Sequence, residues 1–250
     1  MKFNDVIARS REAATWQSCD GQLPKIITRP LTMFRVARNG ILFISLLFSF
    51  LLFSCSANTP TATPQLVTVY STSAAQPWLS DLYNCAGQQN NVVISHVDDL
   101  SSAEIALRVG EPRNLTSSAF QIDKEDILIV THRQSPVQNL TLESARALFV
   151  GQGDPSVQVW VYASEEDVQE VFDQFVMAGR SVTSSARLAA NPQQMSDTLV
   201  NETNAVGILP RHWKAGDDRE VFMVATVPVL ALTNSEPQGV VKELIACLQK

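Results

Sequence analysis

The chain has 250 residues, a formal net charge of −6 and a hydrophobic content of 45%. From Cys55 onward, 12 Lys and Arg stand against 22 Asp and Glu, so this part carries a charge of −10. That balance excludes nucleic-acid binding through a basic face, and about 195 residues suit one mid-sized domain or two lobes that share a chain.

The first predicted element is a targeting segment between Met33 and Cys55, which contains no acidic residue. Arg35 and Arg38 form a positive start, and residues 41–53 form an apolar run that only two serines interrupt. At about 1.5 Å per helical residue, this run is too short to cross a hydrocarbon core of roughly 30 Å comfortably. It is typical of the hydrophobic region of a signal peptide.

The apolar run ends in Leu52-Phe53-Ser54-Cys55, which resembles the lipobox of bacterial lipoproteins. The resemblance implies a signal peptide over residues 33–54 and attachment of a lipid, such as palmitate, to Cys55. An uncleaved single-span anchor is the alternative, and both interpretations place residues 56–250 outside the cell membrane.

The segments on either side of the signal peptide differ from it in composition. Residues 1–32 are polar and contain acidic residues, so we interpret them as a misassigned leader and Met33 as the true start. Residues 55–65 are rich in Ser, Thr and Pro and lack charge, which predicts a flexible tether.

Beyond the tether, short apolar strands alternate with amphipathic segments, which indicates an α/β fold with largely parallel pairing. In the predicted helix 165–177, Ser164 is the expected N-cap and Phe172 and Phe175 are expected on the inner face. Pro228 predicts that the last strand lies at an edge, bends, or passes between lobes. The predicted strands cover residues 66–70, 91–95, 105–109, 126–131, 157–162, 205–209 and 222–232, and the predicted helices cover residues 74–85, 141–150, 165–177, 192–200 and 237–248.

Two cysteines follow the tether, Cys85 and Cys247. An even pair in an oxidising compartment predicts a disulfide, with two separate buried thiols as the alternative. A bridge would tie the start of the domain to its last helix.

The common signatures of catalysis and metal binding are absent. The sequence has no Gly-x-Ser-x-Gly nucleophile elbow, no Gly-rich phosphate loop and no His-Glu-x-x-His helix. The three histidines, His96, His132 and His212, are scattered. We therefore expect no enzyme activity, no cofactor and no metal site.

Two polar segments are candidates for binding. Ser71, Thr72 and Ser73 follow the first strand and open a helix, so they could offer donors to an anionic ligand or simply cap the helix. The run Glu165-Glu166-Asp167 could form a carboxylate site, but acids at a helix N-terminus account for it without a function.

Two longer segments resemble a known family. Residues 126–151 (DILIVTHRQSPVQNLTLESARALFVG) are similar to the hinge strand, "N-P-V-x-N-L-T" turn and "L-F-x-G" helix of phosphate-type ABC-transporter substrate-binding proteins. Residues 204–210 (NAVGILP) resemble a second-lobe strand of that family. The resemblance implies a two-lobed, type II periplasmic-binding-protein-like α/β fold with mixed, mostly parallel sheets. Lobe one would comprise residues 66–131 and 224–250, and lobe two residues 132–223.

In that family the ligand lies between the lobes, held by the turn after the first strand and by a Ser-Gly-Thr turn in lobe two. The resemblance carries over to Ser71, Thr72 and Ser73 in the first turn and to Ser164 alone in the second, where three acids follow. These acids would repel phosphate. Glu111, in a turn that departs from the family pattern, and Arg187 complete the candidate ligand-binding residues.

The expected function is that of an extracytoplasmic, lipid-anchored solute-binding protein of an ABC-type importer. It would close on a small solute, with anions among the candidates, and hand it to an ABC permease or another membrane protein. The alternative is a transport-inactive sensory or scaffolding lipoprotein of the same fold that binds a partner protein.

Overall fold

The structure, a computed structural model, describes residues 63–89 and 91–250, which belong to one compact unit. The predicted leader, signal peptide and lipidation site at Cys55, with most of the tether, lie outside the described residues. Among the residues that are described, no helix has both the length and the apolar character needed to cross a bilayer.

Within residues 63–89 and 91–250, eight strands form a single mixed sheet in the order β2-β1-β3-β8-β4-β7-β5-β6. Four neighbouring pairs are parallel and three are antiparallel, which confirms the predicted mixed, mostly parallel pairing. The strands are β1 (Gln65–Ser71), β2 (Val92–His96), β3 (Ile105–Val109), β4 (Ser118–Thr131), β5 (Gln158–Val161), β6 (Arg187–Leu188), β7 (Ala205–Pro210) and β8 (Arg219–Thr233).

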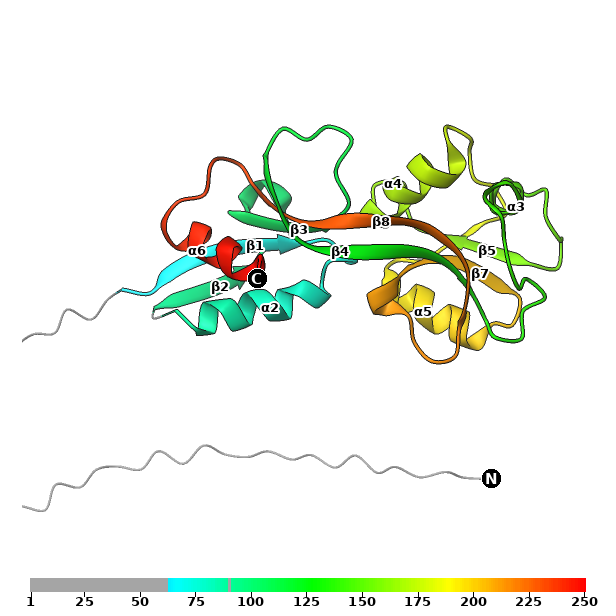
Figure 1. The fold of residues 1–250 in the computed structure, drawn as a ribbon, viewed down its shortest axis with the longest axis horizontal. Coiled ribbons are helices and arrows are strands. Elements are labelled where there is room, and N and C mark those ends of the chain that lie inside the picture. The colour runs from blue at the N-terminus through cyan, green and yellow to red at the C-terminus, as the bar shows by residue number, and fades with distance from the viewer. Residues whose placement is uncertain (1–62, 90) are drawn as a thin grey trace, which may run out of the picture. The chain divides into compact units, whose positions relative to one another are not determined.

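Two long strands, β4 and β8, run side by side from one lobe into the other (Figure 1). Lobe one contains β1, β2 and β3, and lobe two contains β5, β6 and β7. The predicted boundary at residue 131 lies at the lobe-two end of β4, because Ile127–Thr131 already pair with β7. Pro228 lies where β8 passes between the lobes, and its carbonyl accepts a hydrogen bond from the Gly110 N–H at 2.8 Å.

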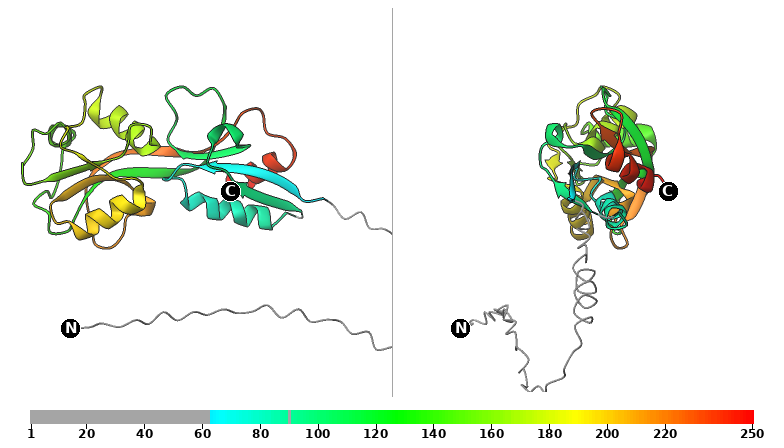
Figure 2. Two further views of the ribbon diagram at one scale, coloured as in Figure 1. Left: turned by 180° about the vertical axis from the view of Figure 1, so that it is seen from behind. Right: turned by 90° about the vertical axis from the view of Figure 1, so that its left-hand side faces the viewer.

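The helices cover both faces of this sheet, with α2 and α5 on one side and α4 on the other (Figure 2). Most buried apolar side chains of both lobes form one large cluster, and Ala106, Leu230 and Leu232 form a small second one. Thr141 caps α3, in a capping box with Ser144. The helices are α2 (Pro77–Gly87), α3 (Leu142–Phe149), α4 (Asp167–Phe172), α5 (Pro192–Asn201) and α6 (Gly239–Leu248).

The predicted helix over residues 165–177 differs in two ways from α4. The N-cap of α4 is Glu166 and not Ser164, so Ser164 lies before the helix and is exposed. The helix also ends at Phe172 and continues as one π-helical turn, Asp173–Met177. Because this turn contains an extra residue, the faces shift, and Phe175 is 44% exposed instead of buried.

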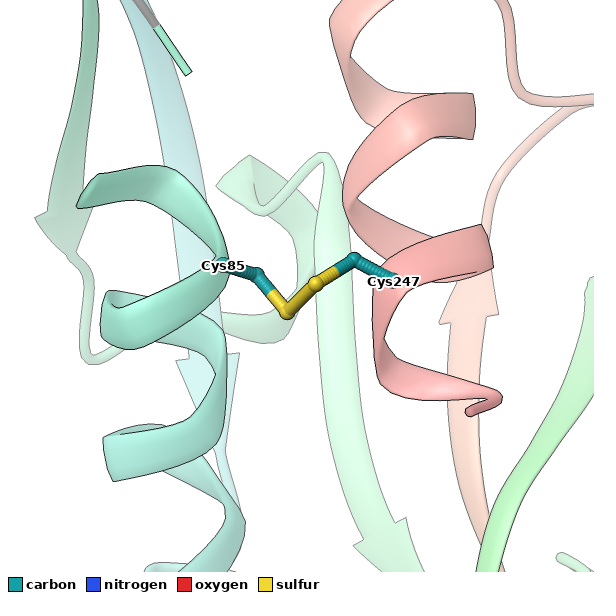
Figure 3. The surroundings of a disulfide bond; sticks show 2 residues. All are labelled: Cys85 and Cys247. Carbon is teal, nitrogen blue, oxygen red and sulfur yellow. A yellow bond between two sulfur atoms is a disulfide. The ribbon is translucent and has the colours of Figure 1, made fainter. Parts of the chain in front are cut away.

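A disulfide joins Cys85 in α2 to Cys247 in α6 (Figure 3), with 6.0 Å between the two Cα atoms. That separation lies within the usual range for a bridge. The structure therefore contains the covalent link between the first and last helices of lobe one, and not two separate thiols.

Candidate functional site

The candidate site lies where the turn between β1 and α2 meets lobe two. The carboxyl end of β1 is beside the carboxyl end of β3, because the two strands pair in parallel from Val69 to Ser71. The Thr72 N–H donates to the Leu107 carbonyl at 3.0 Å, which holds the turn against β3. In α/β sheets, ligands bind at the edge where such carboxyl ends meet.

The carboxylate of Asp167, from lobe two, occupies the donors of this edge. The Thr72 hydroxyl donates to Asp167 Oδ2 at 2.6 Å, and the Val109 N–H donates to the same oxygen at 2.8 Å. The Val168 N–H donates to Asp167 Oδ1 at 2.9 Å. Asp167 is only 2% exposed, so its charge is balanced by hydrogen bonds and not by water.

Two further polar contacts link the lobes beside Asp167. The Ser73 hydroxyl donates to Glu166 Oε2 at 2.9 Å. Arg108, on β3, donates from Nη2 to Glu170 Oε2 at 2.9 Å, and both side chains are largely buried. The site is thus closed by residues from the carboxyl ends of two lobe-one strands and from the first turn of α4.

Burial sets the electrostatics of the site. It raises the pKa of Asp167, although hydrogen bonds from Thr72 and Val109 and the charge of Arg108 act in the opposite direction. Burial also raises the pKa of Glu166, and the charges of Asp167 and Glu165 add to that rise. Two carboxylates therefore already lie close together here, and a further anion beside them would meet repulsion.

A cavity of about 290 Å³ adjoins these contacts. Both lobes line it: lobe one supplies apolar and polar side chains, and lobe two supplies acidic ones. Burial and the nearby carboxylates raise the pKa of its Tyr70. The cavity is lined by Tyr70, Thr72, Ser73, Leu100, Ala106, Leu107, Arg108, Glu165, Glu166, Asp167 and Leu232.

The structure brings some of the predicted ligand-binding residues together and separates others. Thr72 and Ser73 line the cavity, whereas the nearly buried Ser71 turns its hydroxyl to the Thr72 carbonyl at 3.0 Å. Ser164 is exposed and donates to Glu165 at 3.0 Å.

The other two predicted residues lie away from this cavity. Glu111 lines a larger cavity of about 690 Å³, whose rim includes Arg113 and Arg180 and is mostly exposed. Arg187 lies on β6, with its guanidinium carbon 5.6 Å from the centre of the Trp160 ring.

Several residues of the site were not among the predicted ligand-binding residues, and Tyr70, Arg108 and Asp167 are examples. Tyr70 and Arg108 lie in strands whose apolar pattern concealed them. Asp167 was noticed, but acids in a first helical turn are explained by the helix dipole alone. One signal in the sequence could have revealed Asp167. Three acids follow Ser164, where the family that the chain resembles has a neutral Ser-Gly-Thr turn that binds the ligand.

Comparisons with known proteins identify the fold. No protein-family model and no curated protein matches the chain. A solved structure described as a phosphate ABC transporter substrate-binding protein with bound phosphate, from Clostridium perfringens, matches with a TM-score of 0.67 at 13% identity, over 74% of this chain and 93% of that one.

Two other solved structures match over similar lengths. An ABC-type phosphate transport receptor from Vibrio cholerae has a TM-score of 0.54 at 20% identity, over 74% of this chain and 93% of its own. The CcmR regulatory domain from Synechocystis PCC6803, in complex with 2-PG, has a TM-score of 0.56 at 10% identity, over 74% and 95%. At these identities the similarity establishes the fold alone, and the chain has the two-lobed α/β fold of type II periplasmic-binding-protein-like domains.

Proposed function

We propose that this chain is an extracytoplasmic binding protein, and not an enzyme, that holds a small solute between its two lobes and passes it to a membrane permease. Hinge bending of β4 and β8 would open and close the lobes around the solute. The resemblance to transport proteins supports this role, and so does the site.

One observation carries the proposal. The cavity of about 290 Å³ is lined by polar groups from both lobes, at the carboxyl ends of β1 and β3. Its volume is close to the lower limit of small-molecule pockets. A solute that contacts both lobes would favour the closed state over the open one, as binding with hinge closure requires.

Thermal unfolding against a panel of solutes tests this role. We expect a neutral or cationic class of solute, such as sugars or amines, to raise the melting temperature, because a solute at 100 times its Kd adds roughly 2.7 kcal/mol of stability. Organic acids and inorganic anions in the same panel should give no rise. The combined change Ser71→Ala, Thr72→Ala and Ser73→Ala should abolish the response. Arg187→Ala, outside the cavity, is the matched control and should retain it. No response to any compound would contradict solute binding.

We also propose that a lipid on Cys55 anchors the domain, with residues 55–65 as the tether. Metabolic labelling with an alkyne analogue of palmitate should mark the wild-type chain and not Cys55→Ser. A mature mass that still includes residues 33–54 would instead indicate the uncleaved span.

A second candidate function is a transport-inactive lipoprotein that contacts a partner protein. Side chains at the start of α4 bond to Thr72 and Ser73, so lobe-two carboxylates already use donors that a solute would need. Small-angle scattering separates the two roles, because a solute-binding protein should change shape with its ligand whereas a scaffold should not.

A further inference from the structure

Two donors at the lobe interface converge on one acceptor position. The Thr72 hydroxyl and the Val109 N–H point at one position from the carboxyl ends of two parallel strands. Donors converging from adjacent strand ends are the usual means by which α/β folds hold a carboxylate or phosphate. In this chain the group at that position is the Asp167 carboxylate.

Asp167 does more than serve its own helix. Within α4, its Oδ1 accepts from the Val168 N–H at 2.9 Å. Its other oxygen, Oδ2, accepts both of the lobe-one donors, which lie 95 and 58 residues away in the sequence. A side chain that served only α4 would leave those two donors without this partner.

The backbone at the end of β3 allows α4 to approach it closely. Gly110, directly after β3, has a φ of +78° and faces Val171 of α4. A Cβ atom on residue 110 would lie 2.8 Å from Val171 Cγ2, so a side chain there would force the two apart. The close approach of the β3 end to α4 therefore depends on a glycine at this position.

A second set of contacts holds the lobes on the side of α2. The Trp213 indole N–H, from lobe two, donates to the Ala74 carbonyl at 3.0 Å. The His212 ring packs on Trp78 of α2, with 4.7 Å between the ring centroids. The turn that bears Thr72 thus contacts lobe two on both sides.

We propose that Asp167 is a tethered internal anion that occupies the oxyanion position of the cleft and stabilises the closed lobes without a solute. Because this position is filled, free phosphate, sulfate and carboxylates are excluded from it. The inference rests on the proposed function for one point only, the class of solute. A solute in the adjoining cavity would carry no oxyanion and would bond to Tyr70, Ser73 and the acidic side chains as a donor.

Removal of the internal anion should create a site for an external one. In Asp167→Ala, the Thr72 hydroxyl and the Val109 and Val168 N–H groups lose their acceptor, and formate or acetate can take its place. We expect the full-length variant to melt below the wild type in chloride. Formate at ten times its Kd should then raise its melting temperature by about 3–6 °C.

Three controls separate this from a general salt effect. All samples are compared in sodium formate, sodium phosphate and sodium chloride at equal ionic strength. Wild type and Glu165→Ala, which removes an exposed acid next to the site, should show no formate-specific or phosphate-specific rise. Asp167→Asn keeps the space filled and should not respond to formate either.

Each outcome decides for or against the internal anion. A formate response confined to Asp167→Ala supports it, and a variant that folds only in formate supports it most strongly. A rise in the melting temperature of the wild type in phosphate would overturn the proposal. So would an Asp167→Ala variant whose melting temperature, or failure to fold, is the same in formate and in chloride. Failure of every neutral or cationic solute to stabilise the wild type would count against the proposed function and leave this result standing.

Discussion

Reduction of the Cys85–Cys247 disulfide should lower the free energy of unfolding by about 3–5 kcal/mol. The two cysteines are 162 residues apart in the sequence, so the bridge closes a long loop. A loop of this length restricts the unfolded chain strongly, which places the expected loss near the upper end of measured values. Urea unfolding with and without a thiol reductant measures the difference.

The paired substitution Cys85→Ser and Cys247→Ser is the control for reduction. It should unfold at the same urea concentration as the reduced wild type and should not respond to the reductant. Since Cys85 is 5% exposed, the serine hydroxyl adds a small cost of its own. Equal unfolding midpoints for oxidised and reduced wild type would show that the bridge does not limit stability.

Features encoded by neighbouring residues could be predicted from the sequence. β3 has the predicted bounds, Ile105–Val109, because its apolar run is short and ends at Gly110. The cap at Thr141 follows from a hydroxyl placed before an amphipathic run. Alternation of such elements was sufficient to predict the α/β class and, with the family resemblance, the two-lobed fold.

Features that depend on distant partners could not be predicted in this way. The first half of β4, from Ser118 to Glu125, is largely polar, and it becomes a strand because β8 pairs with it. β8 in turn is an interior strand, whereas Pro228 predicted only that it would lie at an edge, bend or pass between the lobes. The π-helical turn after Phe172 also leaves no sequence signal, since its residues suit an ordinary helix.

The site was predicted in part for the same reason. Hydroxyls after β1 are recognisable from local sequence, and Thr72 and Ser73 do line the cavity. Their partners, Asp167 and Glu166, lie 95 and 93 residues away. Acids at a helix start satisfy the helix dipole, so no local conflict in the sequence reveals the contact with the other lobe.

Substitution of Phe172 by alanine should destabilise the protein by about 3–5 kcal/mol, the usual cost of emptying a buried phenylalanine site. Phe172 is fully buried at the end of α4 and packs on Phe149 of α3, with 4.5 Å between the ring centroids. Because α4 begins at Asp167, loss of this anchor should also loosen the carboxylate that closes the lobes. Urea unfolding gives the loss of stability.

Phe175→Ala is the matched control, since Phe175 lies three residues further on and is 44% exposed. Its loss should cost much less, because surface substitutions are usually within about 0.5 kcal/mol. If the two variants lost equal stability, Phe175 would be buried in the core, as the sequence alone predicted. That result would contradict the π-helical turn at residues 173–177. A large loss for Phe172→Ala alone would instead support the turn, and with it the position of Asp167 at the interface.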